Sequence, residues 1–195
     1  MSGVTQSLSA GLRPGGHWRN WVGNQSFIAR HKAEPGSEDE LAALLHEAAR
    51  QNLPVRVAGS GHSFTPIVAT SGLLLSLKNM QGLVSADLDR KRVVVRAGAK
   101  IGDIGRALKE IGLSLANQGD IDTQAIAGAL STGTHGTGIT LGCLSSQAVG
   151  MRLVQADGSV LSVDADADLE MMAAAQVAVG MLGVISAITL QTVDA

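Results

Sequence analysis

The stretch Val55-Arg56-Val57-Ala58-Gly59-Ser60-Gly61-His62-Ser63 decides how this chain is interpreted. A β-branched run ends in two glycines that flank a serine, and a histidine follows at once. Because glycine adopts positive φ and lets the backbone come close to a ligand, such a loop can present N–H groups to an anion. Residues 131–138, with the sequence STGTHGTG, have the same small residues, hydroxyls and single imidazole. The two segments predict loops gathered around an anionic ligand, although the first glycine pair alone fits a plain surface turn equally well.

The composition bounds the class of protein. A chain of 195 residues, 45% of them apolar, can bury the core of one large domain or of two small lobes. With two Trp, two Phe and no Tyr, that core must be built mainly from aliphatic side chains. The net charge of −2 and the scarcity of aromatic rings give no reason to expect nucleic-acid binding.

Three further features bear on the location of the protein. Cys143 is the single cysteine, which excludes an internal disulfide and fits a reducing compartment. No apolar run reaches the ~18 residues of a membrane-spanning helix, and residues 1–16 lack the basic-then-apolar order of a signal peptide. We therefore expect a cytoplasmic protein with no membrane span.

The first part of the chain predicts a small α/β lobe over residues 18–79, preceded by a flexible arm at residues 1–17. Trp18, Trp21 and Phe27 are expected to anchor the start of the lobe on the core. A capping box at residues 37–40 begins a helix whose apolar side chains recur at i, i+3, i+4 and i+7. Strands are predicted at residues 55–58 and 73–77.

The remainder, residues 80–195, predicts a larger lobe of mainly antiparallel sheet flanked by helices. The Asp-Gly turn near residue 157 lies between two apolar runs, which is a strong hairpin signal. The fold class predicted for the chain is therefore α+β. The other elements expected in this lobe are a strand at 93–97, a helix at 101–111 closed by Gly112, a helix at 167–179 and a closing strand at 184–193.

Two common nucleotide-binding loops do not fit the residues around His62. Phe64 stands where the dinucleotide fingerprint has its third glycine, and Pro66 interrupts any helix that would follow. A P-loop would need Gly-Lys-Ser or Gly-Lys-Thr, which this loop does not contain. The loop is therefore neither of the Rossmann type nor a P-loop.

Four motifs taken together resemble the PCMH-type FAD-binding domain of the vanillyl-alcohol oxidase superfamily. They are RVAGSGHSF at 56–64, NQGD at 117–120, GTHGTG at 133–138 and VQADG at 154–158. Within that superfamily the chain is similar to the sugar-lactone oxidases (gulonolactone, arabinonolactone) and to the alditol (xylitol) oxidases, over nearly its whole length. The resemblance implies a flavoprotein oxidoreductase that oxidises a sugar lactone or a polyol by hydride transfer to flavin N5, with oxygen as the acceptor and hydrogen peroxide as the product.

The resemblance also implies which residues hold FAD. His62 matches the histidine that bonds covalently to the flavin ring in many members, the alternative being a non-covalent flavin that His62 merely contacts. The other residues that match cofactor contacts are Val57, Ala58, Gly59, Ser60, Gly61, Ser63, Gly119, Asp120, Ala125, Gly128, Ala129, Leu130, Ser131, Gly133, Thr134 and Ile185.

Four positions have a narrower interpretation, and none is assigned as catalytic. Gly119 matches the point where relatives shield or expose the flavin edge to oxygen, and its small size favours an oxidase over a dehydrogenase. Asp120 stands where alditol oxidases carry a serine, which puts a role toward substrate in doubt. His135 is expected to brace its own loop, and Cys143 to be a small buried residue. The histidines show no metal-ligand spacing, so no metal site is expected.

Relatives continue into a substrate domain that covers the flavin, and we expect that domain to be absent from these 195 residues. The chain is accordingly predicted to bind FAD but to turn over poorly by itself. Two alternatives remain, an isolated flavin-binding module without catalysis and a nucleotide-binding protein of another kind.

Overall fold

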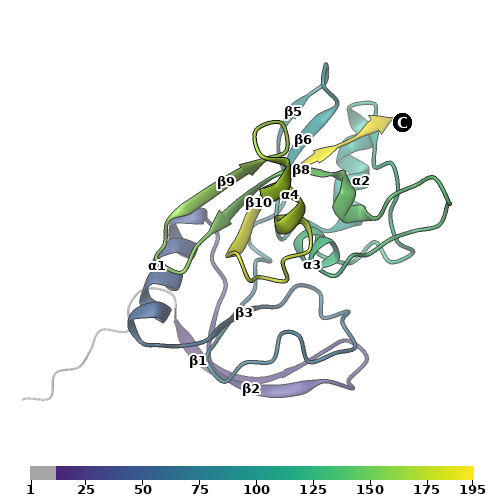
Figure 1. Ribbon diagram of the computed structural model, residues 1–195. Helices are drawn as coiled ribbons and strands as arrows, with labels where there is room; N and C mark the ends of the chain where they lie inside the picture. The colour runs from purple at the N-terminus through teal and green to yellow at the C-terminus, as the bar shows by residue number, and fades with distance from the viewer. Residues whose placement is uncertain (1–11) are drawn as a thin grey trace, which may run out of the picture.

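The computed structural model describes residues 12–195, which form two main sheets (Figure 1). The first sheet has the order β1-β2-β4-β3, with strands Arg13–Arg19, Ser26–Ala33, Leu73–Leu75 and Val55–Val57. The second has the order β5-β6-β10-β8-β9, with strands Leu83–Asp87, Arg92–Arg96, Val184–Gln191, Ala148–Val154 and Val160–Asp164. A short pair, β7 (Leu113–Ser114) and β11 (Val193–Asp194), lies beside them.

The first sheet is mainly parallel because helix α1 (Glu38–Arg50) carries the chain across from β2 to β3. Glu40 N donates to Ser37 Oγ at 3.1 Å, and Glu40 Oε2 accepts from Gly36 N at 2.8 Å. This arrangement confirms the predicted capping box, with its return bond made one residue earlier than in the usual form. The stripe that faces the core is Leu41, Leu44, Leu45 and Ala48, as predicted.

The second sheet is antiparallel throughout, which confirms the predicted architecture of this part of the chain. The hairpin of β8 and β9 closes where Gln155 N donates to Ser159 O at 2.8 Å and Gly158 adopts a φ of +83°. The helices around the sheet are α2 (Ile101–Glu110), α3 (Ile126–Ser131), the 3-10 turn η1 (Leu144–Gln147) and α4 (Leu169–Gln176). Helix α2 ends before Gly112 as predicted, whereas α4 is shorter than the predicted helix at residues 167–179.

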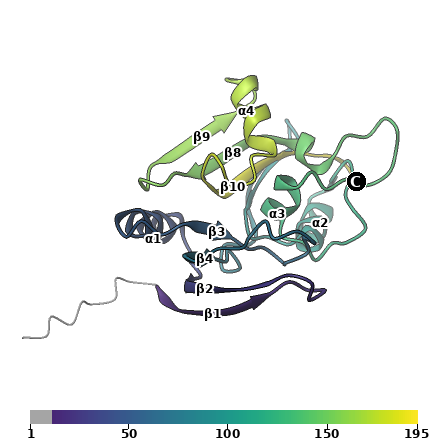
Figure 2. The ribbon, with the colours of Figure 1, turned by 60° about the horizontal axis from the view of Figure 1, so that its bottom comes forward.

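The two sheets form separate layers with α1 and α3 near the space between them, and α4 covers the far side of β8 (Figure 2). Their strands come from separate stretches of chain, residues 13–75 and 83–191. One apolar cluster nevertheless runs through both, from Leu41 on α1 to Ile188 on β10. The α+β class is confirmed, while the division into lobes at residues 79 and 80 stays a proposal.

The predicted flexible arm is wrong for residues 13–17, because they belong to β1 and pair with β2. Gly15 permits this pairing, since a Cβ there would lie 1.9 Å from the Ala29 carbonyl oxygen. Leu12, which precedes β1, is buried, and residues 1–11 of the predicted arm lie outside the described residues.

The predicted aromatic anchor is correct for Trp18 and Phe27 but wrong for Trp21. The Trp18 ring packs on Phe27 with 5.1 Å between ring centroids, in a small cluster on the first sheet. Trp21 is 58% exposed because it lies in the turn between β1 and β2, beyond the apolar face of the sheet. It therefore contributes little to the core.

Candidate functional site

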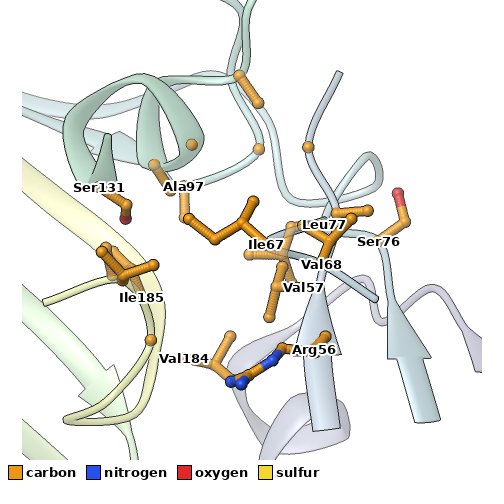
Figure 3. Close-up of a pocket in the computed structure, with 18 of the residues that line it drawn as sticks. Arg56, Val57, Ile67, Val68, Ser76, Leu77, Ala97, Ser131, Val184 and Ile185 are labelled. Atoms are coloured by element: carbon orange, nitrogen blue, oxygen red, sulfur yellow. The ribbon is translucent and has the colours of Figure 1, made fainter. Parts of the chain in front are cut away.

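A cleft of about 400 Å³ lies where the carboxyl ends of the parallel strands β3 and β4 face helix α3 and the start of β10. Val57, Val68 and Leu77 form one wall, and Ser131 and Ile185 lie opposite (Figure 3). The carboxyl ends of parallel strands are a common place for ligands, and the volume is that of a small-molecule site. The lining is mainly apolar.

The glycine loop, defined here as residues 59–63, follows β3 and borders this cleft. Ala58 N still donates to the Leu75 carbonyl oxygen at 2.9 Å, so strand pairing holds the chain up to the loop. Within the described chain, none of the N–H groups of residues 59–63 donates a hydrogen bond to a protein acceptor. Gly61 has a φ of +72°, a conformation that a side chain would strain. The loop thus presents a run of free backbone donors, as anion sites do.

The Ser60 hydroxyl fixes the glycine loop to the segment before α3. It donates to the Thr123 carbonyl oxygen at 2.7 Å and accepts from Ala125 N at 3.0 Å. It also accepts from Lys100 Nζ at 2.6 Å. These three contacts engage the Ser60 side chain fully, which leaves the loop's backbone as the part that can bind a ligand.

His62 lies at the end of the glycine loop with one ring nitrogen bonded and one unpaired. Its ring is 5.4 Å from that of Trp21, and its Nε2 is 3.3 Å from Thr123 Oγ1. Nδ1 is buried and has no partner among the residues that the structure describes. Burial and, second, the Lys100 cation lower the pKa of His62 below 6.5. The imidazole is therefore neutral at physiological pH, with a lone pair available on one nitrogen.

The structure brings most of the predicted cofactor-binding residues to the cleft. Helix α3 contributes only one face, so its side chains divide between cleft and core, and Leu130 is fully buried in the core. The residues at the cleft are Val57, Ala58, Gly59, Ser60, Gly61, His62, Ser63, Ala125, Gly128, Ala129, Ser131 and Ile185.

The remaining predicted residues lie outside the lining of the cleft: Gly119, Asp120, Leu130, Gly133 and Thr134. Gly119 is buried against the loop that follows α3, and a Cβ there would lie 3.0 Å from Thr134 Cγ2. Asp120 is exposed and forms no hydrogen bond within residues 12–195. Their roles toward a cofactor stay proposals.

A family model described as an FAD binding domain matches residues 29–164. The chain belongs to this FAD-binding domain family. L-gulono-1,4-lactone dehydrogenase of Mycobacterium tuberculosis is 44% identical over 176 residues, which cover 90% of this chain and 40% of that protein. L-gulonolactone oxidase of Mus musculus is 35% identical over 179 residues, covering 92% of this chain and 41% of that protein. The chain thus spans about 40% of the length of these curated relatives.

A solved structure supports the same fold for the FAD-binding domain. Cholesterol oxidase from B. sterolicum superposes with a TM-score of 0.82 at 19% identity, over 94% of this chain and 37% of that one. At this identity the likeness concerns the fold alone. The resemblance inferred from the four motifs is confirmed at the level of the family.

The residues present fit the cofactor that the family name implies. FAD carries a pyrophosphate between two ring systems, and the glycine loop offers unpaired N–H donors to a mainly apolar cleft. Gly59 lies so close to α3 that a Cβ would be 3.2 Å from that of Ala125. At one end of the cleft the Arg56 guanidinium reaches toward Val184 (Figure 3). A cation there and another at Lys100 suit an anionic ligand.

Sequence reasoning missed several residues that line the FAD-binding cleft. Lys100 precedes a helix, and no local pattern links it to a loop 40 residues earlier. Ile67 and Val68 lie in a loop of mixed composition with no periodicity. Leu45 was assigned to the core-facing stripe of its helix, and only the structure shows that Leu45 and its neighbour Ala49 also line the cleft.

Other kinds of site are not found in the part of the chain that the structure describes. None of the helices in residues 12–195 is both long and apolar enough to cross a membrane. The same residues contain no group of three or more side chains placed to hold a metal ion. Cys143 is unpaired and half-buried at the start of η1, away from the cleft.

Proposed function

We propose that the chain binds FAD in this cleft and forms the cofactor-binding part of an oxidoreductase that oxidises a sugar lactone. The observation that carries the proposal is the run of backbone donors at residues 59–63 with no acceptor in the described chain. These donors suit a pyrophosphate, and the apolar walls suit the rings on either side of it. The names of the relatives, a lactone dehydrogenase and a lactone oxidase, support the substrate class.

Each part of the site has a task in this proposal. The glycine loop binds the pyrophosphate through its N–H groups, and the Ser60 hydroxyl holds the loop in place. Val57 and Ile185 exclude water from opposite walls, which strengthens every polar contact inside the cleft. Once bound, the flavin would supply the hydride acceptor that the protein's own side chains lack.

We further propose that His62 is the covalent attachment point of the flavin. A neutral imidazole with an unpaired nitrogen is a competent nucleophile, and burial keeps this ring neutral. The alternative is that His62 only packs beside a non-covalent flavin. Acid denaturation distinguishes the two, because a covalent flavin stays with the precipitated protein.

The acceptor and the substrate are the least constrained parts of the proposal. Gly119 supports oxygen as the acceptor, with hydrogen peroxide as the product, because it has no side chain that could shield the flavin edge. An alditol remains the second substrate class, since the motifs resemble alditol oxidases as well. A cytoplasmic location is proposed only on the strength of the lone Cys143.

A substrate panel tests this function. We expect the 195-residue chain to bind FAD. In anaerobic mixing, gulono- and arabinono-lactones should reduce the bound flavin only slowly, because the groups that bind the substrate are proposed to lie outside these residues. Absence of flavin uptake would overturn the proposal. Rapid oxidation of a lactone would contradict the view that further catalytic groups are required. Flavin uptake with no reduction by any lactone or alditol would favour a binding module, which the relatives do not favour.

A further inference from the structure

His62 also borders a second hollow of about 500 Å³, lined by residues at the start of α2 and before α3. The charged groups that face His62 from these elements are Lys100, Asp103, Arg106 and Asp122. Asp103 and Arg106 form an ion pair with each other. Lys100 has no carboxylate within salt-bridge distance in the described chain, and its ammonium bonds to the Ser60 hydroxyl instead. Because its ammonium group bonds only to this hydroxyl among the described residues, Lys100 is suited to holding Ser60, and with it the glycine loop, in place.

The backbone holds Lys100 rigidly in this place. Lys100 forms a β-bridge with Ala125, and the next residue, Ile101, donates its N–H to the Gln124 carbonyl oxygen at 3.1 Å. The side chain therefore reaches Ser60 from a fixed point. The 2.6 Å contact with Ser60 Oγ ties the glycine loop to the N-terminus of α2.

Thr123 connects the same loop to the imidazole through two different groups. Its carbonyl oxygen accepts from the Ser60 hydroxyl at 2.7 Å, and its own hydroxyl lies 3.3 Å from His62 Nε2. Ser60 and His62 are thus held by one residue, while Lys100 holds Ser60 from the other side. No other polar partner of the His62 ring is found in residues 12–195.

We propose that Lys100 and Thr123 are positioning residues for His62: Lys100 clamps the glycine loop through Ser60, and the Thr123 hydroxyl accepts a hydrogen bond from Nε2–H, so that Nδ1 carries the lone pair. This inference rests on the proposed role of His62 as the flavin tether. A neutral imidazole has one donor and one acceptor nitrogen, so a proton fixed on Nε2 leaves Nδ1 free to react.

The charge of Lys100 adds a second effect on the same ring. A nearby cation disfavours the imidazolium form, and Lys100 lowers the pKa of His62 in addition to the larger effect of burial. Replacing the cation by an apolar chain should therefore raise the pKa of His62.

Nitrogen NMR of His62 in the flavin-free 195-residue chain tests the positioning directly. In the native protein we expect the Nε2–H tautomer. Thr123→Val should convert it to a mixture with Nδ1–H, and Thr123→Ser should restore it. Lys100→Met should raise the pKa of His62, and Lys100→Arg should keep it low. Lys109→Met removes the lysine in the last turn of α2, which does not line the hollow. It is the matched control and should change neither the tautomer nor the pKa of His62.

The rate of acid-stable flavin attachment is the second readout. Thr123→Val should slow it by about twofold, because an even mixture of tautomers halves the fraction of rings with a free Nδ1. Lys100→Met should also slow it, because the glycine loop loses its clamp and more of the imidazole is protonated. An unchanged tautomer and pKa in both variants would overturn the inference. If the native chain takes up no FAD while the NMR shifts occur as expected, the proposed function fails and the positioning of His62 stands.

Discussion

Glu38 Oε1 lies 2.5 Å from Arg152 Nη2, and this ion pair joins the start of helix α1 to strand β8 of the second sheet. The other carboxylate oxygen accepts from Arg152 Nε at 3.0 Å and from the Ser186 hydroxyl at 2.6 Å. Ser186 is only 2% exposed, so the carboxylate reaches the edge of the core. The helix of the first sheet is therefore fastened to the second sheet by a partly buried charge.

Glu38→Gln should lower the free energy of unfolding by about 1–2 kcal/mol, because it weakens charge-assisted hydrogen bonds to a carboxylate whose side chain is only 27% exposed. Urea denaturation at neutral pH measures the change. The control is Asp194→Asn, since Lys91 and Asp194 are also 2.5 Å apart but 42% and 74% exposed. That substitution should cost less than about 0.5 kcal/mol. Equal losses in the two variants would show that burial is not the deciding factor.

The contribution of Glu38 should depend on pH in one direction. The Arg152 guanidinium, assisted by Ser186 and opposed by burial, lowers the pKa of Glu38 below its ordinary 4.5 in the folded state. A lowered folded pKa stabilises the protein fully above the unfolded value, and the stabilisation is lost as the pH falls through the folded pKa. The difference in Tm between the native chain and Glu38→Gln should thus be constant near neutrality and shrink below about pH 4.5. A difference that grows toward acid would refute the assignment.

Gly61→Ala should weaken FAD binding by about tenfold, because it strains the loop by roughly 1–2 kcal/mol at a position that must present N–H groups. Its φ is +72°, and Gly112, at +75°, offers a matched control away from the cleft. Gly112→Ala should lose stability to a similar extent and keep its flavin. Flavin content per chain, read from the visible spectrum, separates the two. Equal flavin content in both variants would remove the glycine loop from the cofactor site.

Gly119→Ala should slow reoxidation by oxygen by about tenfold, since a methyl group at this position would shield the flavin edge. A Cβ at residue 119 would lie 3.0 Å from Thr134 Cγ2, so the neighbouring loop must shift slightly. Stopped-flow reoxidation with oxygen and with an artificial acceptor measures the effect. Gly105→Ala, in open space on α2, is the control and should alter neither rate. An unchanged rate with oxygen in Gly119→Ala would exclude the gating role.

Local patterns predicted the elements whose causes are local. The stripe Leu41, Leu44, Leu45 and Ala48 faces the core as its spacing requires, and the Asp-Gly turn closes the β8–β9 hairpin. The strand order β1-β2-β4-β3 depends on pairing between distant segments, which no local pattern encodes. The same limit explains why β1 was not predicted. Its glycines and charged residues are typical of a loop, and only the pairing with β2, where Gly15 lies against Ala29, makes it a strand.

The candidate site divides in the same way. The glycine loop could be predicted because its residues are contiguous and its backbone chemistry follows from glycine. Lys100 and Thr123 could not, because their contacts with Ser60 and His62 span 40 and 61 residues. Leu130 was expected at the cofactor, but helix α3 directs it into the core.

The most direct test of the account is the flavin content of the purified chain before and after acid denaturation. We predict about one FAD per chain, with the yellow colour retained by the precipitate in the native protein and released to the supernatant in His62→Ala. Release of the colour from both proteins would contradict the covalent tether. A colourless native protein that does not bind added FAD would contradict the central claim that this cleft holds the cofactor.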